Sequence, residues 1–187
     1  MKRWVFLSSL LLMVTALVQA QTDSPIRPLP ICVEGAVGRG LLTSRNPELP
    51  RRIEFAFDVY RYEFPWEPYE RIEGRFYLSA WYESGTTIEV RTGRIEELTV
   101  EFDPERGGIA TFGGPGYAII RRPFGTPIGR EGYVDVVAVD GPPSPCPECP
   151  TDRLTVTFTP IDGTPPITFS GYVIPRTGDI RVFRRCR

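Results

Sequence analysis

The chain has 187 residues, of which 41% are hydrophobic and 12% aromatic, and its 22 basic and 23 acidic side chains give a formal net charge of −1. This length suits one domain of about 150 residues, and the balanced charge gives no electrostatic reason to expect nucleic acid as a partner. The sequence has no His, and its last Lys is Lys2. Triads and dyads with a His or Lys base are therefore excluded, zinc is disfavoured, and we expect no metal and no cofactor.

The first twenty residues have the pattern of a secretion signal. Lys2 and Arg3 precede an apolar run at 4–18, and small residues end at Ala20. The run is shorter than the roughly 20 residues that a membrane-spanning helix needs. We therefore predict cleavage before Gln21, a secreted or extracytoplasmic mature chain, and no insertion of that chain into a membrane.

Period-two alternation of apolar and polar residues dominates the remaining chain. Ile53, Phe55 and Phe57, for example, fall on one face of a strand and polar residues on the other. Gly-containing turn signals separate nearly all such segments, and no helix is predicted. We predict an all-β fold, an antiparallel β-sandwich or barrel of about nine strands. The segments with strand character are 52–59, 72–81, 87–92, 94–102, 109–112, 117–120, 133–139, 154–158, 167–173 and 180–183.

The predicted organisation is a signal peptide at 1–20, a segment at 21–50 that leads into the first strands, and a single β domain at 51–187. Residues 133–139 are apolar on both faces apart from Asp135, which is typical of a central strand covered on both sides. Asp135 is then expected to be partly buried, either as a structural acid paired with an Arg or as a site residue with a raised pKa.

Six short stretches, taken together, resemble a known family. In this order they are similar to the post-COAP domain family of bacterial secreted and surface proteins, over about residues 51–185. The resemblance implies a compact, mostly β extracellular module without established catalytic residues. The chain departs from the family in a Pro-rich insert at 142–150 and in its Cys residues. The stretches are IEFAF at 53–57, GRFY at 74–77, ATFGG at 110–114, GYVDVVAVDG at 132–141, DRLTV at 152–156 and TGDIRV at 177–182.

The four Cys residues are predicted to form two disulfides, because export favours oxidation. Cys32 precedes the predicted strands and Cys186 follows them, so a bridge between these two residues would tie both ends of the domain. Cys146 and Cys149 have the spacing of a redox motif, but the surrounding Pro residues oppose the helix that such a motif uses. We therefore predict a second structural bridge within the insert.

Carboxylates are the remaining catalytic candidates, since glycoside hydrolysis uses two acids. Nothing in the sequence selects a pair among the 23 acids. Asp140 and Asp152 flank the insert and have two interpretations. They contribute oxygen ligands to a calcium site, or Asp140 supports a turn and Asp152 begins a strand.

Aromatic residues supply the candidate binding surface. Tyr60, Tyr62, Tyr77 and Trp81 have the parity opposite to the apolar face of their strands, and Trp66 lies between the two strands. Partly exposed aromatic rings with polar tips suit a protein or glycan partner. The alternative is a second small hydrophobic layer beneath the loop at 64–69, because aromatic cross-strand pairs stabilise sheets without binding anything.

These observations predict a secreted, non-enzymatic β module with a structural or binding role at the bacterial cell surface. Two alternatives stay open. One is a small carbohydrate-active enzyme with paired carboxylates, and the other is a β-barrel that carries an apolar ligand, which requires an interior cavity.

Overall fold

The structure, a computed structural model, describes residues 29–43, 50–65, 67, 69–103, 107–142 and 151–187, and these form ten β-strands. None of the described residues belongs to a helix long and apolar enough to cross a membrane. The predicted all-β class is therefore confirmed. The strands are β1 Cys32–Leu42, β2 Arg52–Glu63, β3 Arg71–Trp81, β4 Thr87–Thr92, β5 Glu97–Asp103, β6 Gly107–Arg121, β7 Ile128–Asp140, β8 Arg153–Pro160, β9 Ile167–Tyr172 and β10 Asp179–Cys186.

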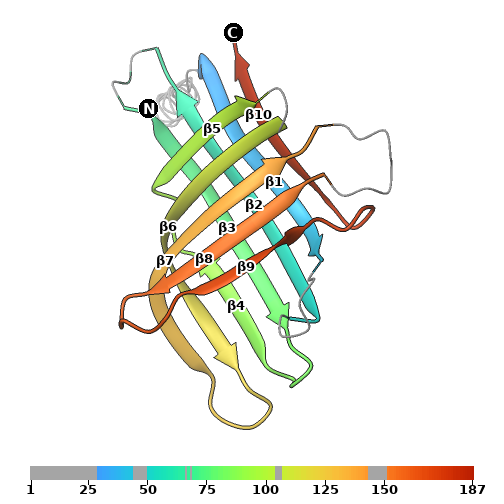
Figure 1. Cartoon of the computed structure of the whole chain (residues 1–187). Helices are drawn as coiled ribbons and strands as arrows, with labels where there is room; N and C mark the ends of the chain where they lie inside the picture. The colour runs from blue at the N-terminus through green and yellow to red at the C-terminus, as the bar shows by residue number, and fades with distance from the viewer. Residues whose placement is uncertain (1–28, 44–49, 66, 68, 104–106, 143–150) are drawn as a thin grey trace, which may run out of the picture.

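All ten strands belong to one antiparallel sheet in the order β10-β1-β2-β3-β4-β6-β7-β8-β9, and β5 pairs with the first half of β6. The sheet curls into a half-barrel in which β6 to β9 cross in front of β10, β1, β2 and β3 (Figure 1). A bridge between Leu42 and Val173 joins the end of β1 to the segment after β9. The two sides of the curled sheet thereby meet at one point, and the half-barrel is consistent with the predicted sandwich or barrel-like fold.

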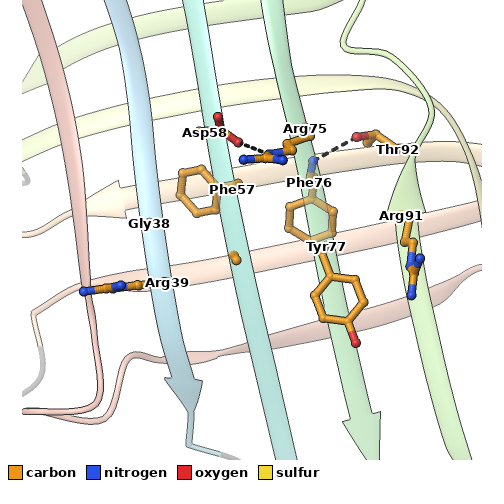
Figure 2. A pocket seen from close by; sticks show the side chains of 10 residues that line it. Gly38, Arg39, Phe57, Asp58, Arg75, Phe76, Tyr77, Arg91 and Thr92 are labelled. Carbon is orange, nitrogen blue, oxygen red and sulfur yellow. Dashed lines mark hydrogen bonds and ion pairs between the residues drawn. The ribbon is translucent and has the colours of Figure 1, made fainter.

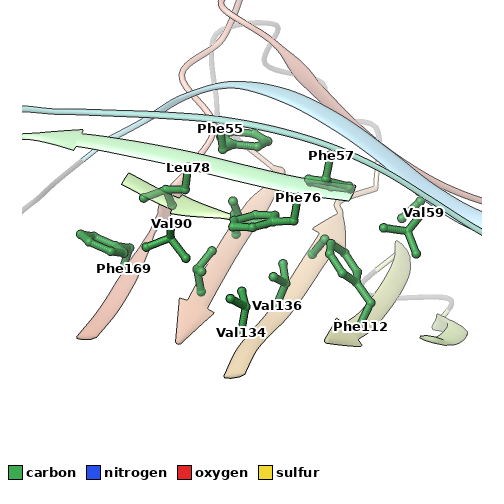
Figure 3. Packing of buried hydrophobic residues seen from close by; sticks show 14 of the residues in the cluster. Phe55, Phe57, Val59, Phe76, Leu78, Val90, Phe112, Val134, Val136 and Phe169 are labelled. Carbon is green, nitrogen blue, oxygen red and sulfur yellow. The ribbon is translucent and has the colours of Figure 1, made fainter. Parts of the chain in front are cut away.

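The inner face of the half-barrel is packed with aromatic and branched side chains (Figure 3). Phe57 of β2 pairs in register with Phe76 of β3, and both point inward. The ring of Phe112 from β6 lies 5.2 Å from the ring of Phe57 and 6.3 Å from that of Phe76, measured between centroids. Since these rings come from opposite halves of the curled sheet, they hold the two halves together.

Side-chain carboxylates occupy the edge of β10 that faces away from β1. Asp140 accepts a hydrogen bond from the backbone N–H of Val182 at 2.9 Å, and Asp152 accepts one from Ile180 at 2.8 Å. A second oxygen of Asp152 accepts from the N–H of Gly141 at 3.2 Å. An unpaired edge is a site for further strand pairing, so the two acids block it.

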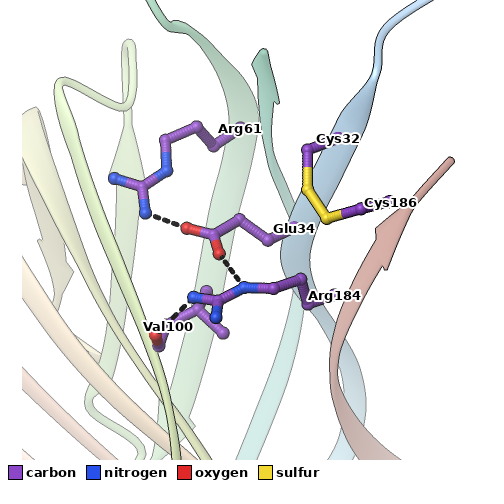
Figure 4. The surroundings of a disulfide bond; sticks show 6 residues. All are labelled: Cys32, Glu34, Arg61, Val100, Arg184 and Cys186. Carbon is purple, nitrogen blue, oxygen red and sulfur yellow. Dashed lines mark hydrogen bonds and ion pairs between the residues drawn. A yellow bond between two sulfur atoms is a disulfide. The ribbon is translucent and has the colours of Figure 1, made fainter.

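Arginine side chains cover the edge of β5 by donating hydrogen bonds to its backbone carbonyls (Figure 4). Arg61 donates to the carbonyl of Leu98 at 3.1 Å and Arg184 to that of Val100 at 3.4 Å. Both guanidinium groups also pair with the buried carboxylate of Glu34, which lies between them. The cluster connects β1, β2 and β10 to β5 and fills one end of the barrel with satisfied polar groups.

Three sequence predictions about strands were wrong. The segment before residue 51 contains a complete strand, β1, and the separate strands predicted at 109–112 and 117–120 form the single strand β6. Residues 133–139 are not covered on both sides, because Asp135 and Val137 are exposed on the outer face. The carboxyl of Asp135 is still partly desolvated, and this effect together with nearby Glu97 raises its pKa. The described residues provide no arginine within ion-pair distance of it.

Candidate functional site

Two of the predicted aromatic residues form part of a row of rings on the outer face. Tyr60 and Tyr62 of β2 lie with their centroids 6.1 Å apart. The row continues to Phe64 at 6.3 Å from Tyr62, and to Phe183 of β10 at 6.0 Å from Tyr60. These four residues are called the aromatic row below. Its members come from β2, from the residue after it, and from β10, which is far from β2 in the sequence and separated from it by β1 in the sheet.

A glycine explains how rings from β2 and β10 meet across an intervening strand. Gly35 of β1 is the register partner of both Tyr60 and Phe183. It carries no side chain, so the two rings approach each other above it. A Cβ atom at this position would lie 2.2 Å from the carbonyl oxygen of Val59, so any larger residue would force the backbone to shift. The close approach of the β1 and β2 backbones therefore requires glycine at the position that lies between the two rings.

The aromatic row borders a hollow of about 740 Å³, called the aromatic groove below. Tyr60, Tyr62 and Phe183 form one part of its lining, and Leu29 and Ile31 add apolar surface from the segment before β1. Burial, followed by the nearby carboxylate of Glu73, raises the pKa of Tyr62. Its hydroxyl therefore stays protonated and able to donate a hydrogen bond at neutral pH.

Cationic side chains line the same groove. Arg181, Arg185 and Arg187 contribute to the lining, and the guanidinium of Arg185 lies 5.7 Å from the ring centroid of Phe183. Asp140 is the acidic member of the described lining, and one of its carboxylate oxygens accepts the N–H of Val182. The groove therefore combines aromatic surface with positive charge.

The other predicted aromatic residues lie elsewhere. Tyr77 lies in the middle of the outer face, beside a hollow of about 610 Å³ that Arg39 and Arg75 also line (Figure 2). Trp81 is the last residue of β3 and lines a different hollow together with Tyr82. The guanidinium of Arg52 lies 5.4 Å from the centroid of its ring. Trp66 falls outside the described residues. The structure therefore brings together Tyr60 and Tyr62 and separates both from Tyr77 and Trp81.

Several residues of the groove were not predicted from the sequence, among them Phe183, Arg185 and Arg187. The alternation of β10 contains a signal for two of them, because Ile180 and Val182 are buried and residues 181, 183 and 185 therefore point outward. Their proximity to Tyr60 depends on the pairing of β10 with β1, which joins opposite ends of the chain.

The acids Asp140 and Asp152 accept hydrogen bonds from backbone N–H groups of β10, a role that neither sequence interpretation included. Burial raises the pKa of each carboxyl, while the hydrogen bonds from backbone N–H groups act in the opposite direction. In the described part of the chain, no group of three or more His, Cys, Asp or Glu side chains is arranged to hold a metal ion. The geometry of both carboxylates supports the closure of the β10 edge.

The predicted disulfide between Cys32 and Cys186 is confirmed, and it joins directly opposed residues of β1 and β10 beside the groove. The predicted bridge between Cys146 and Cys149 falls outside the described residues. No protein-family model, curated protein or solved structure matches the chain. The resemblance to the post-COAP family therefore stays a prediction.

Proposed function

We propose that this protein is a secreted, non-enzymatic module that binds a partner at the bacterial cell surface through the aromatic groove. The observation that carries the proposal is the row of rings at centroid distances of 6.0 to 6.3 Å beside an open hollow on the outer face. Partly exposed Tyr and Phe rings supply large contact area at low entropic cost, and aromatic residues are enriched at binding sites. The secretion signal predicted at 1–20 supports a location outside the cytoplasm.

The packing of the barrel favours this role over that of an apolar carrier. A carrier requires an interior cavity, whereas Phe57, Phe76 and Phe112 pack against one another between the two halves of the sheet. The aromatic groove, in contrast, is on the outer face. An apolar ligand of the carrier kind would leave the arginines of that groove without a function.

The number of acidic residues in the lining of the groove favours binding over glycoside hydrolysis. Hydrolysis requires two carboxyl groups on opposite sides of the scissile bond. Among the described residues that line the groove, Asp140 alone is acidic, and its carboxylate already accepts a backbone hydrogen bond. A second carboxylate would have to come from a part of the chain outside this lining.

A comparison of two single variants tests the proposal. The wild-type protein is applied to a glycan array and to isolated bacterial cell envelopes, and bound material is then examined for turnover. We expect binding without turnover, and we expect Tyr62→Ala to weaken it about tenfold or more, as for a residue at a binding hot spot. Trp81→Ala is the matched control, because Trp81 also lies on the outer face but outside the groove.

Stability measurements separate a binding effect from a folding effect. Loss of the partly exposed Tyr62 ring is expected to lower the free energy of unfolding by about 0.2–1 kcal/mol, the range of one cross-strand pair. Equal weakening of binding by Tyr62→Ala and Trp81→Ala would contradict the proposed location of the site. Release of cleaved glycan by the wild-type protein would contradict the non-enzymatic role.

A further inference from the structure

We infer that the aromatic groove binds an acidic glycan, a chain of sugar rings that carry carboxylate groups. The inference rests on the proposed binding function and adds the chemical class of the ligand. The sugar rings would lie against Tyr60, Tyr62 and Phe183, and the carboxylates would pair with Arg185 and Arg187.

The charges of the groove favour an anionic ligand. Of the three arginines in the lining, Arg181 already pairs with Asp179, with 2.8 Å between Nε and Oδ2. In the described part of the chain, neither Arg185 nor Arg187 lies within ion-pair distance of an acidic side chain. The carboxylate of Asp140 is engaged by the N–H of Val182. Two guanidinium groups are therefore available to a ligand, and each is able to bind a carboxylate through two parallel hydrogen bonds.

The backbone that carries both arginines is held in place before any ligand arrives. Cys186 lies between them in the sequence, and its disulfide to Cys32 holds this part of β10 against β1. The backbone N–H of Arg187 donates to the carbonyl of Ile31 at 2.9 Å. The guanidinium of Arg185 lies 5.7 Å from the ring centroid of Phe183. Such pre-organisation reduces the entropic cost of binding.

The aromatic part of the lining favours rings over a compact inorganic anion. Tyr60 and Tyr62 are both half-buried, so each presents part of its ring to the groove, and their centroids lie 6.1 Å apart. A ligand with several linked rings covers this surface, and its hydroxyl groups find partners in the Tyr hydroxyls and the guanidinium groups. A phosphate or sulfate ion would leave the aromatic surface exposed to water.

The neighbouring strand edge argues against an acidic peptide. Extended peptides gain affinity by adding a strand to an open sheet edge. The edge of β10 beside the groove has its N–H groups at Ile180 and Val182 already bonded to Asp152 and Asp140. A peptide would have to displace these carboxylates, whereas a glycan on the face of the sheet would not.

Polygalacturonate oligomers and their fully methyl-esterified counterparts test the inference, because they share the same rings and differ in charge. Calorimetric titration of the full mature protein is expected to show binding of the acid form and about tenfold or more weaker binding of the ester. Raising the NaCl concentration from about 0.05 to 0.5 M is expected to weaken binding of the acid form, because salt screens exposed charges.

Paired arginine variants locate the contact. Arg185→Ala with Arg187→Ala is expected to weaken binding of the acid form about tenfold or more, and to leave binding of the ester nearly unchanged. Arg122→Ala with Arg153→Ala removes the same charge at exposed positions outside the groove, and we expect less than about a twofold change. Arg185→Lys with Arg187→Lys keeps the charge without the planar fork, and an intermediate loss is expected. Circular dichroism checks that each variant is folded.

Each contrary result identifies the step that fails. Equal affinity for the acid and the ester would overturn the acidic specificity and leave the proposed binding function intact. Binding of polyglutamate as tight as that of polygalacturonate would overturn the choice of a glycan over a peptide. If the folded wild-type protein bound neither glycan, nor polyglutamate, nor isolated cell envelopes, the proposed function would fail together with the inference.

Discussion

The contact between Gly38 and Phe57 predicts that two destabilising substitutions will compensate each other. The two residues are register partners on β1 and β2, and both face the interior. A Cβ atom at Gly38 would lie 2.5 Å from Cζ and 2.6 Å from Cε1 of Phe57. Gly38 is not among the residues with positive φ, so backbone strain does not complicate the effect of an alanine there.

The magnitudes follow from burial and packing. Phe57 is 5% exposed and contacts the rings of Phe55 and Phe112 at centroid distances of 6.0 and 5.2 Å. Phe57→Ala is therefore expected to cost about 3–5 kcal/mol, and Gly38→Ala about 1–3 kcal/mol because it overpacks the core. In the double variant the added methyl group occupies space that the ring has left. We expect the combined loss to fall short of the sum by about 1–3 kcal/mol.

Urea unfolding of the wild type, the two single variants and the double variant measures this coupling. Phe124→Ala is the control, because Phe124 is 92% exposed and its removal is expected to change the free energy of unfolding by less than about 0.5 kcal/mol. If the two losses added to within about 0.5 kcal/mol, the contact between Gly38 and Phe57 would be refuted. A cost of Phe57→Ala below about 1 kcal/mol would refute its place in the core.

Three further predictions concern the polar closures and the disulfide. Glu34→Ala removes the buried acid that Arg61 and Arg184 share, while Arg61 keeps its ion pair with the exposed Glu70. Urea unfolding should show a loss of about 1–3 kcal/mol, against about 0–1 kcal/mol for the exposed control Glu54→Ala, and equal losses would contradict this. Cys186→Ser removes a disulfide that joins residues 154 positions apart, and it should lower the free energy of unfolding by up to about 5 kcal/mol. If the variant had the same Tm as the wild type without reductant, the stabilising role of this disulfide would be contradicted. Burial raises the pKa of the Asp140 carboxyl in the folded protein above its usual value of 3.8. Folding therefore favours the protonated form, and this carboxyl adds to the stability of the wild type as the pH falls from above the folded-state pKa towards 3.8. Asp140→Asn keeps an oxygen acceptor for the N–H of Val182 but has no titrating carboxyl. The free energy of unfolding of this variant should therefore fall further below that of the wild type as the pH is lowered, and a difference that does not change with pH would exclude this linkage.

The alternation of side chains was sufficient to predict most strands, because one face of the sheet is buried and the other faces water. It failed for β1, where Gly35, Gly38 and Gly40 interrupt the pattern that side chains would otherwise show. Glycine also concealed the continuity of β6. Residues 113–116 have the composition of a turn, yet the strand passes through them, and a Cβ atom at Gly114 would lie 2.0 Å from the carbonyl oxygen of Arg94. Close approach of two backbones, not chain reversal, requires glycine there.

The candidate site was only half predictable, because its two sides come from opposite ends of the chain. Parity identified Tyr60 and Tyr62 as outward-facing, and it separated them correctly from the core residues of β2. It contained no information on which strand lies beyond β1. Cys32 and Cys186 did contain such information, because a disulfide between them requires the ends of the domain to be adjacent. Combining that bridge with the parity of residues 181, 183 and 185 would have placed Phe183 on the outer face near Cys32, but its place beside Tyr60 also needs the strand β1, which the alternation did not predict.

The near-neutral net charge conceals two different uses of arginine in this fold. Arg61 and Arg184 point inward, where they share the carboxylate of Glu34 and donate to the open edge of β5. Arg185 is adjacent to Arg184 in the sequence, so the alternation of β10 places it on the opposite face, beside the aromatic row. The inner arginine is neutralised by a buried acid, while the outer one lies beside an aromatic ring. Consecutive residues of one strand thus close the barrel on one side and provide positive charge to the groove on the other, although the composition of the whole chain indicates no preference for an anionic partner.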